Sequence, residues 1–203
     1  MTKILYIHGL NSSPASSKAQ QLFSAMRQMG IAGQLYLPAL HHHPRQAIAQ
    51  LEALIDEADD EQLVLVGSSL GGYYATFLAH QHGLKAVLIN PSVRPHKRIA
   101  ESQVLQTNYY TGETWLPTED HVTALAELEV SAPQNPQRCQ VWLQTADETL
   151  DYREAEAFYR GCSLRIQAGG DHSFQGFAAR LPMLFAFAGI DARLWRDIDF
   201  SDL

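Results

Sequence analysis

Short apolar runs alternate along the chain with longer segments in which apolar residues recur at helical spacing. The runs at 63–66 and 86–89 are apolar at every position. Strands of that kind are typical of a parallel sheet that is covered on both faces. The predicted strands are residues 4–8, 34–37, 63–67, 86–90, 140–145 and 163–167. The pattern therefore predicts a mostly parallel sheet of about six strands.

The segments between the predicted strands carry helix signals. Helix starts are predicted at Ser13-Pro14, at Pro44 and at Asp151, the last as an N-cap residue. The first of these helices is expected to end at Gly30. A final helix over 174–188 is expected to be kinked at Pro182. Because strands and helices alternate, the fold class is α/β with helices on both faces of the sheet.

One segment departs from this alternation. Residues 91–138 contain five prolines and one clear helical pattern, near 118–129. We interpret this stretch as either a small lid or a long crossover connection. The chain is then a single domain over 1–203 without a large cap domain. The tail at 190–203 mixes aromatic residues with aspartates, and its pattern assigns it no role.

Composition and charge narrow the classes of function. Among the 203 residues, 46% are hydrophobic and 18% are charged, which excludes a disordered chain. The net charge of −7 argues against nucleic acid or an anionic membrane as a partner. The longest uncharged apolar stretch, 181–190, is too short to cross a bilayer. Cys139 and Cys162 are too few for a disulfide framework, so we expect free thiols and a cytoplasmic location.

The strongest chemical signal is Gly67-Ser68-Ser69-Leu70-Gly71, which matches the G-x-S-x-G pattern. It directly follows a predicted all-apolar strand and precedes a predicted helix, the setting of a nucleophile elbow. The two glycines leave room for a turn that holds Ser69 in strained backbone geometry. Ser68 does not fit the spacing, because position 70 is leucine. The pattern therefore makes Ser69 the candidate nucleophile.

A serine nucleophile needs a base and a group that orients the base. His172 follows the last predicted strand and has the chain order that this fold requires, serine, acid, histidine. Asp147 is the first carboxylate after the strand at 140–145 and is the favoured acid, with Glu148 as the alternative. Asp151 is discounted because helix capping accounts for it.

Backbone amides near Ser69 are candidates for an oxyanion hole. One is the N–H of Leu70, directly after the nucleophile, and the other is the N–H of Leu10, with Asn11 as its alternative. Leu10 follows His8-Gly9 at the end of the first predicted strand. We interpret His8 as a residue that shapes this loop by local hydrogen bonds and not as a base.

These residues resemble the α/β-hydrolase superfamily and, more narrowly, the YqiA-type small bacterial esterases. The strings that carry the resemblance are 8–14 (HGLNSSP), 67–75 (GSSLGGYYA), Asn90-Pro91, 93–95, 110–112 and 147–153. It extends over about residues 3–188. The resemblance implies a minimal hydrolase with esterase or thioesterase activity and supports Ser69, Asp147 and His172 as its triad. The chain departs from the family pattern at Asp171, at 41–43 and in the tail.

Weaker signals are open to two interpretations each. One interpretation of the run His41-His42-His43 is a metal site. Three successive side chains do not converge readily on one ion, however, and we favour a solvated loop. Arg94 and Asn11 are candidate substrate contacts. The cluster of Arg94, Lys97 and Arg98 would attract an anionic substrate, or it is a solvated helix start. Tyr109, Tyr110 and Trp115 form either a lip for an acyl chain or packing within 91–138.

The sequence therefore predicts a serine hydrolase that acts on carboxylic esters or acyl thioesters, with a small-molecule substrate. No metal and no organic cofactor is expected. Two alternatives remain open at this point. One is a non-catalytic module that binds an acyl ligand on the same fold, and the other is an acyltransferase.

Overall fold

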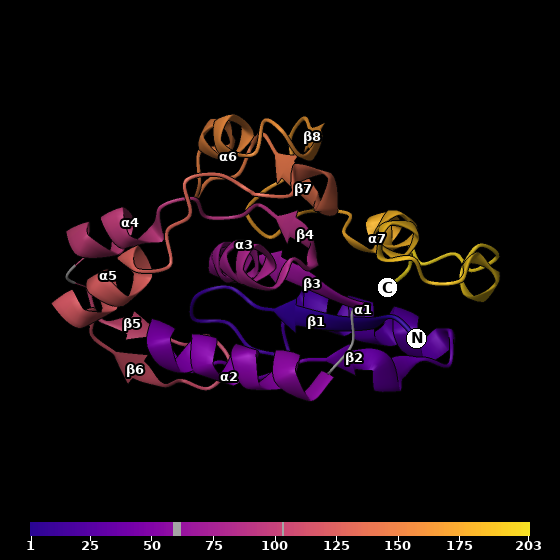
Figure 1. The fold of residues 1–203 in the computed structure, drawn as a ribbon, viewed down its shortest axis with the longest axis horizontal. Coiled ribbons are helices and arrows are strands. Elements are labelled where there is room, and N and C mark those ends of the chain that lie inside the picture. The colour runs from indigo at the N-terminus through magenta and orange to yellow at the C-terminus, as the bar shows by residue number, and fades with distance from the viewer. Residues whose placement is uncertain (59–61, 103) are drawn as a thin grey trace.

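The computed structural model describes residues 1–58, 62–102 and 104–203. Its centre is a six-stranded sheet in the order β2-β1-β3-β4-β7-β8, and every neighbouring pair in it is parallel (Figure 1). The strands are β1 (Lys3–Ile7), β2 (Leu35–Tyr36), β3 (Leu63–Ser68), β4 (Lys85–Ile89), β7 (Cys139–Gln144) and β8 (Ser163–Gln167). The predicted parallel sheet of six strands is confirmed.

Alternate side chains of each strand enter two separate hydrophobic cores. Leu5 and Ile7 of β1 belong to one core, and Ile4 and Tyr6 belong to the other. The first core contains residues of α2 (Pro44–Ala58), α3 (Leu70–His82), α5 (Glu119–Ala126) and α6 (Tyr152–Phe158). The second contains residues of α1 (Ser17–Gln28) and α7 (Leu181–Ala188). Helices thus cover both faces of the sheet, as the all-apolar strands predicted.

Two predicted helix boundaries are wrong. Helix α1 begins at Ser17 and not at Pro14, because the Ser13 hydroxyl accepts the Ala15 N–H at 3.0 Å and shapes a turn before the helix. Helix α7 begins at Leu181, so Pro182 lies in its first turn, where no intrahelical N–H is needed and no kink results. A 3-10 turn, η3 (Ala178–Arg180), precedes α7.

The cap expected at Asp151 is present. Its side chain accepts the Arg153 N–H at 3.0 Å at the start of α6.

Most of the segment 91–138 forms small elements at one end of the sheet, and its last residues lead into the start of β7 (Figure 1). They are α4 (Pro95–Glu101), β5 (Gln106–Thr107), β6 (Thr114–Trp115), α5 and η2 (Pro136–Arg138). Strands β5 and β6 pair antiparallel in a hairpin that the sequence did not reveal, because each contributes only two paired residues. Helix α5 packs against α4 and α2.

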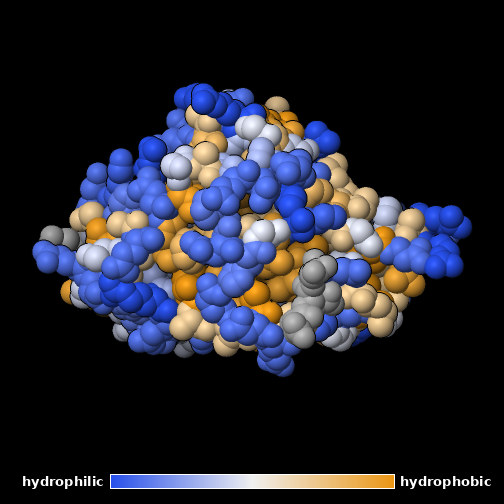
Figure 2. Space-filling view, in the orientation of Figure 1, coloured by the Kyte–Doolittle hydropathy of each residue, from blue (hydrophilic) through white to orange (hydrophobic). Residues whose placement is uncertain are grey.

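The tail packs on the face that α1 and α7 cover. Phe200 is buried, its ring 5.6 Å from that of Phe185, and the Gln21 side chain donates to the Leu203 carbonyl at 2.9 Å. Two short 3-10 turns complete the fold, η1 (Ala32–Gln34) and η4 (Ala192–Leu194). In the view of Figure 2, hydrophilic side chains cover most of the outer rim, and hydrophobic ones show between the elements near the middle. Within the described ranges, no helix has the length and apolarity to cross a membrane.

Candidate active site

Ser69 lies at the sharp turn between β3 and α3, at the carboxyl edge of the sheet. Its backbone has φ 56° and ψ −119°, a conformation that costs a non-glycine residue of order 1–3 kcal/mol. Hydrogen bonds hold the turn in place. The Ser69 N–H donates to the Ile89 carbonyl at 3.0 Å, and the Ser69 carbonyl accepts the Gly72 N–H at 2.9 Å and the Ser92 N–H at 3.1 Å. The surrounding backbone therefore imposes the strained geometry.

The two glycines around Ser69 are required by close backbone contacts. A Cβ atom on Gly67 would lie 2.3 Å from the Gly71 carbonyl oxygen. A Cβ atom on Gly71 would lie 2.0 Å from the carbonyl oxygen of Ile7 on the neighbouring strand. Helix α3 can begin this close to the sheet only because neither position has a side chain. The match to G-x-S-x-G thus has a steric cause in this fold.

Ser69, His172 and Asp147 form a continuous hydrogen-bonded chain. The Nε2 atom of His172 lies 3.0 Å from the Ser69 Oγ. The Nδ1 atom of His172 lies 2.8 Å from Asp147 Oδ2 and 3.0 Å from Oδ1. Since a carboxylate only accepts, Nδ1 carries the proton in this arrangement, and in the neutral ring Nε2 is left to accept the Ser69 hydroxyl proton. This arrangement can activate a serine hydroxyl.

Asp147 is buried, with 2% of its side chain exposed, whereas His172 is 22% exposed. Burial raises the pKa of the Asp147 carboxyl, but the hydrogen bonds from His172 and from the backbone N–H groups of Leu150 and Thr149 outweigh it and hold the pKa below its ordinary value. Both backbone bonds are 2.8 Å long. The carboxyl is therefore ionised at neutral pH and oriented from two sides.

The neighbouring acids have different contacts. Glu148, the alternative acid, accepts the backbone N–H of His172 through Oε2 at 2.9 Å and does not bond the imidazole. Asp171 accepts the side-chain N–H of Gln175 at 2.9 Å. Asp147 is thus the carboxylate that meets the ring.

The amides of Leu10 and Leu70 lie in the region expected for oxyanion donors. Leu70 is the first residue of α3, so its N–H has no acceptor within the helix. Leu10 and Leu70 both line a cavity of about 350 Å³ that also contains Ser69 and His172. Gly9 packs against Ser69, since a Cβ atom on Gly9 would lie 3.2 Å from Ser69 Cβ.

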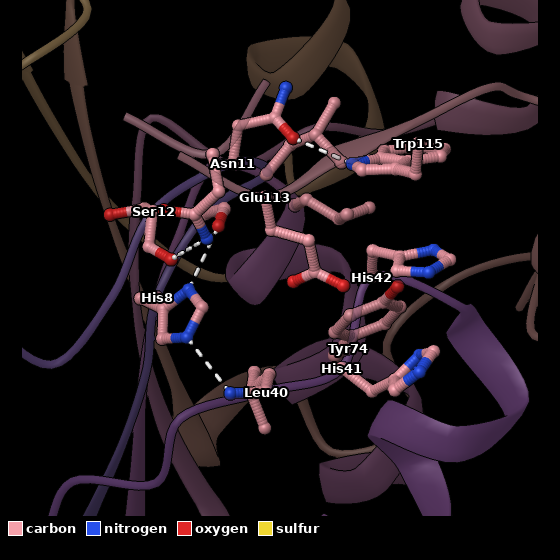
Figure 3. A pocket seen from close by; sticks show the side chains of 13 residues that line it. His8, Asn11, Ser12, Leu40, His41, His42, Tyr74, Glu113 and Trp115 are labelled. Atoms are coloured by element: carbon pink, nitrogen blue, oxygen red, sulfur yellow. Dashed lines mark hydrogen bonds between the residues drawn. The ribbon is translucent and has the colours of Figure 1, made fainter. Parts of the chain in front are cut away.

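His8 shapes the loop that carries Leu10, as the sequence predicted. Its Nδ1–H donates to the Gly9 carbonyl at 2.9 Å, and its Nε2 accepts the Leu40 N–H at 3.1 Å (Figure 3). These contacts require the neutral ring, because a protonated Nε2 could not accept. Burial lowers the pKa of His8, and the hydrogen bond to the Gly9 backbone opposes that effect only in part.

The two candidate substrate contacts occupy different places. Asn11 lines the cavity of about 350 Å³, but its side chain is used in fixing the β5–β6 hairpin, donating to Gln106 at 2.8 Å and accepting from Trp115 at 2.9 Å. Figure 3 shows the second of these bonds. Arg94 donates to Glu129 at 3.0 Å and lines another cavity, away from Ser69.

Two buried side-chain amides position the His172 loop, and the sequence did not mark either of them as a site residue. The Asn90 side chain donates to the carbonyls of Asp171 and His172 at 3.0 and 3.3 Å and accepts the Gln144 N–H at 3.0 Å. The Gln144 side chain accepts the N–H groups of Asp171 and Gln175 at 3.0 and 2.9 Å. Their signal in the sequence is a side-chain amide at the end of a largely apolar strand, at the edge where the site forms.

The histidine run packs against the hairpin. The His42 ring stacks on Trp115 with centroids 5.0 Å apart, and Trp115 stacks on His121 at the same distance. His43 forms a contact of 2.8 Å with Asp120. In the described part of the chain, no group of three or more histidine, cysteine, aspartate or glutamate side chains is placed to hold a metal ion.

Comparison with known proteins places the chain in a family. The model of the uncharacterised protein family UPF0227 matches residues 3–189. The chain belongs to the UPF0227 family. The UPF0227 protein of Shewanella woodyi is 28% identical over 192 residues, which cover 91% of this chain and 98% of that protein. The UPF0227 protein of Pectobacterium carotovorum subsp. carotovorum is 26% identical over 192 residues, which cover 91% and 97%.

Solved structures share the fold of this UPF0227 chain. Est1E of Butyrivibrio proteoclasticus, solved with ferulic acid bound, has a TM-score of 0.68 at 12% identity and covers 93% of this chain and 86% of its own. A structure of the metagenome-derived lipolytic enzymes LipS and LipT has a TM-score of 0.69 at 17% identity and covers 94% of both chains. An alpha-beta serine hydrolase homologue from Coxiella burnetii has a TM-score of 0.58 at 14% identity, covering 94% and 86%. The predicted α/β-hydrolase fold is therefore confirmed.

Two cavities of the UPF0227 chain meet at Ser69 and His172. The lining of the cavity of about 350 Å³ is mixed, with the apolar side chains of Ile99, Trp115 and Leu150 beside polar ones that include Arg98. The other, of about 540 Å³, extends toward the start of α1 and contains Lys18. A substrate bound covalently to Ser69 would have space on both sides.

Proposed function

We propose that this protein is a serine hydrolase that cleaves carboxylic esters or acyl thioesters through an acyl-enzyme intermediate. The observation that carries the proposal is the hydrogen-bonded chain from Ser69 through His172 to Asp147 at a strained strand-to-helix turn. A binding module would not require a serine in strained backbone geometry or an imidazole oriented by a buried carboxylate. Such groups are the parts that nucleophilic catalysis by serine uses.

In the first half of the reaction, His172 Nε2 takes the hydroxyl proton of Ser69 as Oγ attacks the acyl carbonyl carbon. The carbonyl oxygen becomes an oxyanion, and the N–H groups of Leu10 and Leu70 donate to it. The imidazolium that forms is stabilised by the ionised Asp147 at Nδ1. The carbon–oxygen or carbon–sulfur bond then breaks, and His172 gives its proton to the departing alcohol or thiol.

In the second half, His172 activates water by the same route. The water oxygen attacks the acyl carbon of the acyl-enzyme, and His172 returns the proton to Ser69 Oγ as the carboxylic acid leaves. A water and an ester are consumed, and an acid and an alcohol are released. These protein groups account for every proton transfer in the cycle.

The acyl chain is assigned to the cavity of about 350 Å³. Leu10 and Leu70 both line it, and so do the apolar side chains of Ile99, Trp115 and Leu150. An acyl chain there would bury its methylene groups at roughly 0.8 kcal/mol each. Trp115 closes one side of this cavity and is itself held by Asn11.

The test is a ladder of matched acyl esters and acyl thioesters of increasing chain length, with Ser69→Ala as the blank. Hydrolysis that peaks at one length and disappears in the variant supports the proposal and measures the acyl cavity. Labelling by a fluorophosphonate, read by intact mass, should add one adduct to the wild-type protein and none to Ser69→Ala. A folded wild-type protein that neither turns over nor labels would favour a module that only binds. Transfer of the acyl group to an added alcohol in preference to water would identify an acyltransferase.

A further inference from the structure

The cavity of about 540 Å³ beside Ser69 contains a lysine that the proposed reaction does not use. Lys18, in the first turn of α1, is half-buried, and its Nζ donates to the Ser173 carbonyl at 2.8 Å. Ser173 directly follows His172, so the ammonium lies beside the loop that carries the proposed base. An ammonium has three N–H bonds. This carbonyl takes up one of them.

The charge of Lys18 is not neutralised by an ion pair. Across 1–58, 62–102 and 104–203, no carboxylate forms an ion pair with its Nζ. Among the described residues that line the cavity, Lys18 is the only lysine, arginine, aspartate or glutamate. The rest of the lining is rich in hydroxyl groups, among them Tyr6, Ser12, Ser16, Ser17 and Tyr110. In a protein of net charge −7, the proposed nucleophile thus opens onto a cavity with one cation and many hydrogen-bonding groups.

The position of this cavity indicates which part of a substrate it holds. The carbon attacked by Ser69 carries an acyl chain on one side and a leaving alcohol or thiol on the other. The cavity of about 350 Å³ suits the acyl chain, because Leu70, Ile99 and Leu150 line it. His172, which must protonate the leaving atom, also lines the Lys18 cavity. We therefore expect the alcohol or thiol part of the substrate to occupy the cavity that contains Lys18.

We propose that Lys18 binds an anionic group, a carboxylate or a phosphate, on the alcohol or thiol part of the substrate. The inference rests on the proposed hydrolase function and specifies the substrate class of that site. A charged hydrogen bond to a half-buried ammonium is about twice as strong as a neutral one. Lys18 is then a specificity-determining residue, and the reaction prefers esters or thioesters whose leaving part is negatively charged.

The surroundings of Lys18 set the pH range in which it can act. Burial lowers its pKa to about 8, while the charges of Asp171 and Asp147 act in the opposite direction. The other titratable groups that face the cavity are His172, Tyr6, Tyr109 and Tyr110. The ammonium form, which binds an anion, therefore predominates at neutral pH and is lost as pH rises through about 8.

The experiment compares hexanoyl esters that differ only in the leaving phenol. One carries the carboxylate of meta-hydroxybenzoate, a second carries the neutral amide of meta-hydroxybenzamide, and a third carries a phosphate in the same position. A fourth ester has a neutral phenol and a carboxylate at the far end of the acyl chain. The measured quantity is kcat/KM for each ester at neutral pH. Ratios between esters are compared across variants, so that the intrinsic reactivity of each phenol cancels.

Three variants separate charge from structure. Lys18→Gln keeps an N–H donor for the Ser173 carbonyl but removes the charge. Lys18→Arg keeps the charge. Arg27→Met, on the exposed side of the last turn of α1, removes one positive charge from the same helix without touching the Lys18 cavity. A purely structural role of Lys18 would change kcat/KM equally for the anionic and neutral esters.

We expect the ratio of anionic to neutral ester to fall about tenfold or more in Lys18→Gln, mainly through KM, because a hydrogen bond to a charged group is lost. Lys18→Arg and Arg27→Met should retain the ratio. In the wild-type protein the ratio should fall as pH rises through about 8, and in Lys18→Arg it should stay level. The values of kcat/KM for the carboxylate ester and the phosphate ester show which anion is preferred.

The inference is overturned if Lys18→Gln leaves the ratio unchanged, if Arg27→Met lowers it equally, or if only the ester with a charged acyl chain responds. Failure of the hydrolase proposal looks different. In that case the wild-type protein cleaves none of the four esters and takes up no fluorophosphonate.

Discussion

The Nε2 atom of His172 lies 3.0 Å from the Oγ atom of Ser69, although 103 positions separate the two residues in the sequence. Each side of this contact is anchored independently. Ser69 is fixed by hydrogen bonds to the backbone of Ile89 and Ser92. The His172 loop is fixed by the side-chain amides of Asn90 and Gln144. The geometry therefore depends on the sheet edge and not on the local sequence around either residue.

The strained backbone of Ser69 can be separated from its chemistry. At φ 56° and ψ −119°, alanine carries the same Cβ strain as serine, whereas glycine adopts this conformation freely. We expect Ser69→Ala and Ser69→Gly both to abolish ester turnover. Ser69→Gly should have a free energy of unfolding about 1 kcal/mol higher than Ser69→Ala, which urea titration measures. Near-wild-type turnover in either variant would refute Ser69 as the nucleophile, and equal stabilities would refute the strain.

Asp147 and Glu148 are adjacent carboxylates with different expected effects. Asp147→Asn places an amide opposite His172 Nδ1 and favours the wrong tautomer, so kcat should fall about 10³- to 10⁴-fold. Glu148→Gln retains an oxygen that can accept the backbone N–H of His172, so kcat should change only a few-fold. Steady-state kinetics of the two variants show which carboxylate is the acid of the triad. If Glu148→Gln is the more damaging substitution, Asp147 is not the acid of the triad.

Gly71 has no space for a side chain. A Cβ atom there would lie 2.0 Å from the Ile7 carbonyl oxygen, and backbone atoms of a central strand cannot move aside cheaply. Gly71→Ala should therefore lower the free energy of unfolding by about 3 kcal/mol or more, or prevent folding. Gly33→Ala is the matched control, since nothing lies within 4 Å of a Cβ atom at that position. Thermal unfolding of both variants provides the measurement, and similar melting temperatures would contradict the steric argument.

Sequence patterns predicted the sheet well because its strands are buried on both faces. The runs 63–66 and 86–89 have no polar position, and that property belongs to the strand itself. Helix boundaries were less accurate, since they depend on single side chains. The Ser13 hydroxyl could cap a helix or shape a turn, and only the structure shows that it accepts the Ala15 N–H in a turn.

The contacts of the candidate site were harder to anticipate than its members. Ser69, His172 and Asp147 follow a known order along the chain, so their meeting at one sheet edge could be inferred. The partners of Asn11 could not, because they come from a hairpin that has no strong pattern of its own. The partner of Arg94 is Glu129, and a helical pattern near it does not show what its side chain contacts. Lys18 was overlooked for a similar reason. A lysine in the first turn of an amphipathic helix usually faces water, and only the fold brings this one beside Ser173.

The stack of His42, Trp115 and His121 predicts a pH dependence of stability. Burial is the largest cause that lowers the pKa of His42 and of His121, and the charges of neighbouring histidines add to it. The two rings also share a hydrogen bond of 3.3 Å between His42 Nδ1 and His121 Nε2, in which only one ring can donate. In the unfolded chain both rings have a pKa of about 6.5. The folded protein therefore binds fewer protons than the unfolded chain below that pH.

The sign follows from this difference in proton binding. As pH falls from about 7 through the lowered pKa values of the two rings, the unfolded state gains protons and the free energy of unfolding decreases. His42 is half-buried and His121 is buried, so both rings resist protonation in the folded protein and contribute to this loss. His42→Phe keeps an aromatic ring against Trp115 but cannot take up a proton. Urea unfolding at pH values above and below 6.5 should show a smaller loss of stability in this variant than in the wild-type protein.

A second measurement separates this cluster from His8, whose pKa is also lowered by burial. Trp115 reports on the stack directly, because its ring lies 5.0 Å from both His42 and His121. The fluorescence change of Trp115, obtained as the difference between wild type and Trp115→Phe, should have a midpoint below about 6.5 and should shift in His42→Phe. Other charged and titratable side chains face the same cluster, and both proteins retain them. They are His41, His43, Arg45, Glu113 and Asp120. A midpoint above 6.5, or one that His42→Phe leaves unchanged, would show that this stack does not resist protonation.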